Sequence, residues 1–168
     1  MKRGIRNNNP LNIRHSADRW EGAKMNQTDK NFVQFESMDY GYRAAWKVLE
    51  TYWHHFLAEK KPFNPKNIID RWAPPTENDT QAYIRTVLGI SGLGGNEHLP
   101  QPSRRVDTER LVTLLAAMTV VECGIPMGEV DKQAIRKGCR MAFKGKRSLA
   151  RTQPVAGDLL MLDEYHDW

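Results

Sequence analysis

One glutamate stands on a helix face where an apolar side chain is expected. The stretch 108–123 predicts an apolar helix, and its buried stripe continues to Glu122. The other members of this stripe are Leu111, Leu114, Leu115 and Met118. Burial and the negative end of the helix dipole both disfavour an ionised carboxylate, so the pKa of Glu122 should be raised, as a general acid requires. The alternative is a carboxylate at a frayed helix end that turns into water.

A second group of carboxylates lies in the stretch TENDTQAYIRTVLG. Asn78 and Gln81 form a capping-box pattern that predicts the start of a helix, and Gly89 predicts its end. Glu77 and Asp79 fall at the positive end of this helix and should stay ionised, which suits a partner carboxylate or a base that positions water. Plain helix capping is the alternative for both.

The beginning of the chain is rich in asparagine and poor in apolar residues. It reads RGIRNNNPLNIR over residues 3–14. Asparagine is unfavourable inside helices because its short amide competes for neighbouring backbone groups. The segment is therefore either an unstructured start or a built loop whose amides have partners.

The elements that must position these groups are mainly helices. Apolar spacing predicts helices over 39–58 and 128–142, and Pro65 after Asn64 predicts a third that ends before Pro74. Asp107 is the expected cap of the helix over 108–123. The residues before 36 are irregular, with hints of one short strand. Three tryptophans on apolar stripes are interpreted as core: Trp46, Trp53 and Trp72.

Length and composition predict a single mainly helical domain over 1–145 with a C-terminal tail over 146–168. Two cysteines and five scattered histidines favour neither a disulfide scaffold nor a metal site, and no cofactor is expected. The net charge of +5 favours an anionic partner such as nucleic acid, an acidic glycan or a membrane surface.

From the hydropathy pattern we expect neither a membrane span nor a secretory signal. The apolar stretch LVTLLAAMTVV is about half of what a bilayer span needs, so no membrane span is expected. The basic start MKRGIRNNNP has no apolar region behind it, which argues against a secretory signal. We expect a soluble protein made in the cytoplasm, which could act elsewhere after lysis, through a secretion machine or as part of a virion.

Several short motifs resemble the lysozyme-like superfamily. VVECGIP, at the end of the apolar helix, resembles the segment that carries the catalytic glutamate of that superfamily, and the similarity is greatest to glucosaminidases and flagellar muramidases. Their further motifs are matched, in order, by NNNPLNIR (7–14), RWEGA (19–23), FVQFESMDYGYRAAWKVL (32–49) and ENDTQAYIRTVL (77–88). Only the catalytic helix is displaced, from first place to last, which indicates a circular permutation. The stretch GIRNNNPLNIR also resembles the start of lysozyme-like virion proteins of phages.

The resemblance implies a lysozyme-like fold and cleavage of peptidoglycan glycan strands, with Glu122 as the acid. It places Tyr83 over the cleft and makes the asparagine stretch a built loop that lines a sugar groove. Asn8, Asn9 and Asn12 would then bind hydroxyl and N-acetyl groups, although bonding to their own backbone is the alternative.

Three functional readings remain open on the sequence. The first is a muramidase, glucosaminidase or lytic transglycosylase. The second is a structural or virion-associated protein that binds peptidoglycan without cleaving it. The third is nucleic-acid binding through the basic run RKGCRMAFKGKR, which is not expected because Phe143 is its only aromatic residue and a solvated helix face explains the charges.

Overall fold

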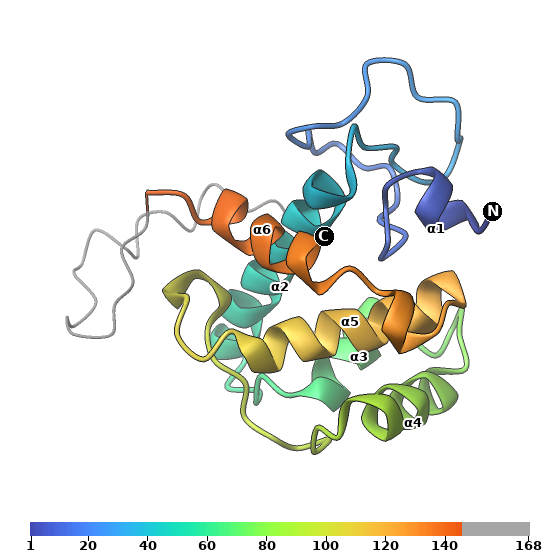
Figure 1. Cartoon of the computed structure of the whole chain (residues 1–168). Coiled ribbons are helices and arrows are strands. Elements are labelled where there is room, and N and C mark those ends of the chain that lie inside the picture. The colour runs from blue at the N-terminus through green and yellow to red at the C-terminus, as the bar shows by residue number, and fades with distance from the viewer. Residues whose placement is uncertain (146–168) are drawn as a thin grey trace.

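The computed structural model describes residues 1–145, so the predicted tail over 146–168 lies outside the described part of the chain. The predicted mainly helical fold is confirmed (Figure 1). The helices are α1 (Arg3–Arg6), α2 (Met38–Ala58), α3 (Pro65–Trp72), α4 (Thr80–Ser91), α5 (Glu109–Cys123) and α6 (Lys132–Ala142), with 3-10 turns at Pro102–Arg104 and Met127–Glu129. Within residues 1–145 the backbone forms only isolated β-bridges, Arg14 with Phe32 and Ala23 with Phe35, in place of the hinted strand.

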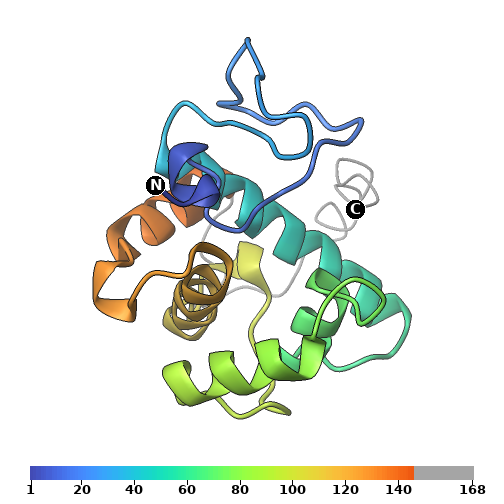
Figure 2. The same ribbon diagram turned by 90° about the vertical axis from the view of Figure 1, so that its right-hand side faces the viewer.

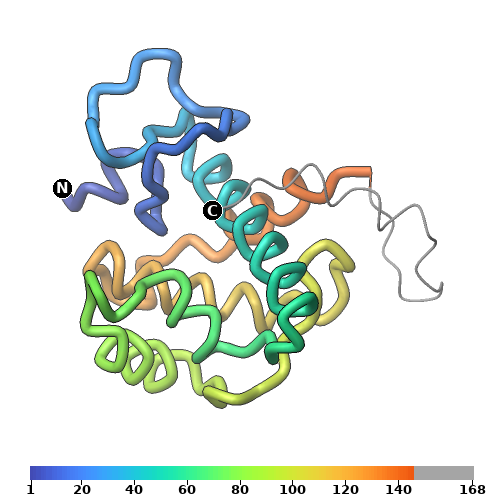
Figure 3. Tube along the Cα trace, turned by 180° about the vertical axis from the view of Figure 1, so that it is seen from behind, coloured from blue at the N-terminus to red at the C-terminus, as the bar shows by residue number. Residues whose placement is uncertain are grey.

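Helix α5 is the centre of the fold. Figure 2 shows it nearly end-on, with α1, α2, α4 and α6 around it. A helix that is apolar on nearly all sides must be covered on nearly all sides, and residues 111–119 of α5 are buried apart from the partly exposed Thr113. The predicted stripe is confirmed, since Leu111, Leu114, Leu115 and Met118 are all fully buried. The view from behind shows α4 below α5 and the N-terminal loops above it (Figure 3).

Helix α6 crosses α2 at close range. The indole of Trp46 in α2 donates a hydrogen bond to the carbonyl of Ile135 at 2.8 Å. Gly138 makes the close approach possible, because a Cβ atom there would lie 2.8 Å from the amide nitrogen of Arg43 and 2.8 Å from the Cβ of Tyr42. The missing side chain of Gly138 is therefore what lets the two helices pack.

Replacing Gly138 by alanine should lower the free energy of unfolding by about 1–3 kcal/mol, since the new methyl group would push α6 away from α2. Gly89 is the matched control, because it lies in α4 and a Cβ atom there would meet nothing within 4 Å. Gly89→Ala should raise stability by about 0.5–1 kcal/mol through helix propensity alone. Urea unfolding of both variants measures the difference. Equal effects of the same sign would contradict this account of the α2–α6 contact.

The asparagine-rich segment is a built loop. The amide of Asn9 is completely buried and donates to the carbonyls of Ile13 at 2.9 Å and Val33 at 2.8 Å. Its oxygen accepts from the amide of Ile13 at 2.9 Å. Asn8 lies in the left-handed region, with φ of 52°, and donates to the carbonyl of Phe35 at 3.1 Å. These amides replace the backbone partners that a sheet would provide, which explains why asparagine is frequent here.

Two predicted helices agree closely with the structure. The helix expected over 39–58 is α2, and the one expected from Pro65 is α3, whose cap Asn64 accepts from the amide of Asn67. Both have strong local signals, namely a long apolar stripe and a proline in the first turn. These two predictions are confirmed.

Other predicted helix ends are wrong by a few residues. Helix α4 is capped by Asp79 instead of Asn78, and it continues past Gly89 to Gly92, which has the left-handed φ of 71°. Asp79 is the cap because its carboxylate accepts from the backbone amide of Ala82. The side chain of Asn78 instead donates to the carbonyl of Pro74.

The remaining corrections concern the first residues of α5 and α6. Thr108, not Asp107, precedes the first residue of α5, because Asp107 adopts a left-handed φ of 53°. The helix expected over 128–142 begins at Lys132, after the cap Asp131, whose carboxylate accepts from the amide of Ala134. Met127–Glu129 form a separate 3-10 turn before it.

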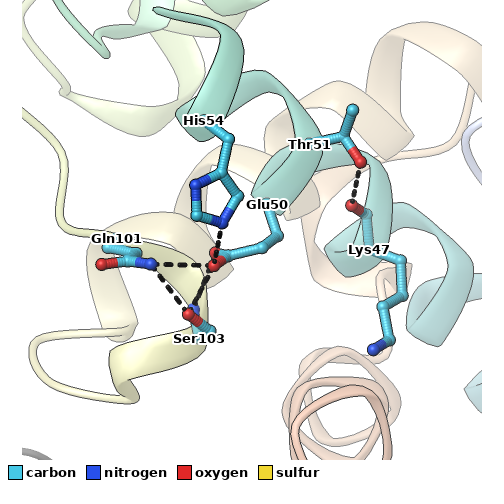
Figure 4. A network of polar contacts seen from close by, with 6 residues as sticks. All are labelled: Lys47, Glu50, Thr51, His54, Gln101 and Ser103. Atoms are coloured by element: carbon cyan, nitrogen blue, oxygen red, sulfur yellow. Dashed lines mark hydrogen bonds and ion pairs between the residues drawn. The ribbon is translucent and has the colours of Figure 1, made fainter. Parts of the chain in front are cut away.

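One buried charge has no counterpart among the sequence-based predictions. Glu50 of α2 is completely buried and binds the turn over Pro102–Arg104 (Figure 4). It accepts hydrogen bonds from the amide and hydroxyl of Ser103 and from the side chain of Gln101, and His54 lies 3.2 Å away. This network ties the middle of α2 to the segment that leads into α5.

Candidate active site

The candidate site is centred on the carboxyl group of Glu122 in the last turn of α5. The helix ends at Gly124, with a left-handed φ of 62°. The amide of Asn12 donates to Oε2 of Glu122 at 2.9 Å, and the hydroxyl of Tyr83 donates to Oε1 at 3.2 Å. Three segments that are far apart in the sequence therefore meet at one carboxyl group: the N-terminal loop, α4 and α5.

The environment of Glu122 raises its pKa above the usual value. Burial is the dominant cause, because it removes water from the charged form. Hydrogen bonds from Asn12, Tyr83 and Trp72 and the charge of Arg14 favour the ionised form and oppose this rise. The carboxyl group is thus more easily protonated than an exposed glutamate, while its orientation is held by donors on several sides.

Tyr83 is a fixed donor at this site. Its ring is buried, and burial together with the neighbouring carboxyl of Glu122 raises its pKa well above the ordinary value. The phenol therefore stays protonated and available to donate to Oε1 of Glu122. It comes from the second turn of α4, whose position is set by the cap at Asp79.

Replacing Tyr83 by phenylalanine should raise the pKa of Glu122 further, because a hydrogen bond that favours the ionised form is removed. Carbon-13 NMR titration of the glutamate carboxyl groups measures this directly, with Glu122→Gln used to assign the signal. Thr86→Val is the control, because this exposed hydroxyl of the same helix bonds only to the carbonyl of Ala82. An unchanged or lowered pKa in Tyr83→Phe would contradict the assigned hydrogen bond.

Two residues at the site are absent from the sequence-based set. Trp72, predicted as core, packs edge-on against the ring of Tyr52, with the ring centres 5.9 Å apart, and also acts to lower the pKa of the Glu122 carboxyl. Arg14, an exposed residue, acts on the charge of Glu122. Their positions in the chain could have identified them as site residues. Arg14 is two residues from Asn12, and Trp72 ends the helix just before the motif of Tyr83.

Four predicted site residues are not joined to Glu122 by a hydrogen bond. Asn8 and Asn9 use their amides to hold the loop, and the complete burial of Asn9 keeps its side chain from a ligand. Asp79 caps α4, which was the alternative to a role in the chemistry. Glu77 is exposed in the turn between α3 and α4.

Two other kinds of chemistry, at a metal ion and at a cysteine nucleophile, are not supported by the described residues. Residues 1–145 contain no group of three or more His, Cys, Asp or Glu side chains that could hold a metal ion. Cys123 beside Glu122 is buried and donates to the carbonyl of Pro10, and burial raises the pKa of its thiol to about 11. It is therefore a poor nucleophile. None of the helices in this part of the chain has the length and hydropathy to cross a membrane.

Comparison with known proteins relates the chain to a bacteriophage protein. No family model matches the sequence. Protein P5 of Pseudoalteromonas phage PM2 is 35% identical over 146 residues, which cover 85% of this chain and 83% of the relative. The expected relation to phage proteins is confirmed in this form. Identity at this level over most of both chains means that the protein belongs to the family of Protein P5 of phage PM2.

Proposed function

We propose that the protein cleaves the glycan strands of peptidoglycan, with Glu122 as the general acid. The observation that carries this proposal is the half-buried carboxyl group of Glu122, with a raised pKa and with Asn12 and Tyr83 as its donors. A protonated carboxyl that is held in one orientation is what glycosidic bond cleavage requires of its acid.

The chemistry assigns a distinct role to each group. The proton of Glu122 passes to the glycosidic oxygen as the bond between that oxygen and the anomeric carbon breaks. Tyr83 and Asn12 orient the carboxyl group and stabilise the carboxylate that remains. Water then attacks the anomeric carbon in a muramidase or glucosaminidase, whereas the substrate's own hydroxyl attacks in a lytic transglycosylase. Glu77 remains the predicted second carboxylate for the hydrolytic route.

The proposal includes a lysozyme-like fold in circularly permuted order. Its support is the convergence of the matched motifs on one carboxyl group. Asn12 belongs to the first motif and Tyr83 to the fourth, and both bond to Glu122, although the helix of Glu122 follows them in the chain. A glutamate remote from both motifs would have argued against the permutation.

The test is digestion of purified peptidoglycan, followed by mass analysis of the fragments. Hydrolysis yields reducing ends, and transglycosylation yields fragments that are lighter by one water molecule; the sugar at the new end identifies the bond. Glu77→Gln serves as the matched carboxylate variant beside Glu122→Gln. If wild-type protein sediments with peptidoglycan and releases no fragments, the non-catalytic wall-binding alternative is correct.

A further inference from the structure

Two arginines lie over one aromatic ring at the edge of the candidate site. The guanidinium carbon of Arg3 lies 4.1 Å from the centre of the Phe32 ring, and that of Arg14 lies 5.1 Å from it. Cation–π contact with one ring holds the two positive charges near each other. Among residues 1–145, neither side chain forms an ion pair within 4.0 Å.

Arg14 is close in the chain to a residue that bonds Glu122. It follows Asn12 by two residues, and Asn12 bonds directly to Glu122. The backbone of this segment is fixed at two points. The amide of Ile13 donates to the side-chain oxygen of Asn9, and Arg14 forms a β-bridge with Phe32. The charge of Arg14 also acts to lower the pKa of the Glu122 carboxyl, although burial of that carboxyl outweighs it.

The surrounding sequence adds to the positive potential. Residues 1–17 contain four lysines or arginines and no aspartate or glutamate. The side chain of Lys2 lies against Gly124, 3.5 Å from the position a Cβ atom would take there, and so beside the end of α5. Asp29 is a nearby counter-charge, since the charge of Arg3 helps to lower the pKa of its carboxyl. The remaining positive charge attracts anions, and arginine favours planar carboxylates that it can bind through two hydrogen bonds.

We propose that Arg14, assisted by Arg3, binds a carboxylate of the glycan next to the bond that Glu122 cleaves, so that the protein selects acidic over neutral glycans. This inference rests on the proposed function and assigns it a substrate class. Intact peptidoglycan offers such carboxylates on its peptides, and its acidic sugar exposes a lactyl carboxylate wherever the peptide has been removed. Chitin, which has a similar backbone of N-acetylated sugars, offers none.

The test measures binding in the background of Glu122→Gln, so that no substrate is consumed. Co-sedimentation is measured with intact peptidoglycan, with peptidoglycan stripped of peptides by an amidase, and with chitin. Adding Arg14→Gln should weaken binding to intact peptidoglycan about tenfold, as loss of a charge-assisted hydrogen-bonded pair does, and leave chitin binding unchanged. A loss that disappears on stripped strands identifies the peptide carboxylates as the ligand, and a loss that persists there shows that the lactyl carboxylate freed by the amidase is bound as well.

Two controls separate recognition from general effects. Arg140→Gln removes one positive charge from an exposed position of α6 and should leave binding unchanged. Arg14→Lys keeps the charge and should restore part of the binding. Equal losses from Arg14→Gln and Arg140→Gln, or an equal loss on chitin, would overturn the inference. If the parent variant binds none of the three glycans, the proposed function itself fails.

Discussion

Replacing Glu122 by glutamine should lower the turnover of peptidoglycan roughly a thousandfold and leave the fold intact. Glutamine has nearly the same size and can still accept from Asn12 or Tyr83, but its amide cannot supply a proton to the leaving oxygen. General acid catalysis contributes about 10²–10⁴ in rate, so the loss should fall in this range. Release of soluble fragments measures turnover, and the urea midpoint reports the fold.

The pH dependence of the wild-type protein provides an independent check. Activity should fall as pH rises through the pKa of Glu122, because only the protonated carboxyl can act as the acid. Burial raises this pKa, so activity should persist to higher pH than an exposed glutamate would allow. The Glu77→Gln variant should keep this descending limb. A fully active Glu122→Gln, or a descending limb that survives in it, would show that another group supplies the proton.

The buried position of the Glu122 carboxyl was predictable from sequence because its signal is local. Met118 and Leu115 lie one and two helical turns before Glu122, and this spacing alone places the carboxyl on the buried face. The rise in pKa follows from that burial. The partners of the carboxyl group have no such local signal, since Asn12 is 110 residues away in the chain. Its inclusion came from the resemblance of motifs and not from periodicity.

The roles of neighbouring asparagines could not be separated from sequence. Asn9 and Asn12 have the same side chain and lie in the same loop, yet Asn9 holds the backbone and Asn12 bonds the carboxyl of Glu122. The difference depends on Val33, whose carbonyl approaches Asn9 from 24 residues away. Trp72 illustrates the converse limit, because an indole on an apolar stripe can pack against one neighbour and still influence a carboxyl group on another side.

The largest stability effect should come from Glu50, a residue outside the candidate site. Burial raises the pKa of its carboxyl, but hydrogen bonds from His54, Ser103 and Gln101 outweigh burial and leave the pKa below its ordinary value. Glu50→Ala removes the acceptor for several donors at once, and Ser103 is itself buried. Loss of one partner from such a buried polar group costs about 3–5 kcal/mol, which is a large part of the stability of a domain.

The sign of the pH effect distinguishes this network from simple packing. A carboxyl whose pKa is lowered by folding stabilises the protein above its ordinary pKa, and this stabilisation is lost as pH falls through the folded value. Urea midpoints of the wild-type protein should therefore decrease on acidification below about pH 4, and this decrease should be smaller in Glu50→Ala. Glu36→Ala, at an exposed position just before α2, should change stability by no more than about 0.5 kcal/mol. If Glu50→Ala unfolds at the same urea concentration as Glu36→Ala, the network does not hold α2 to the segment before α5.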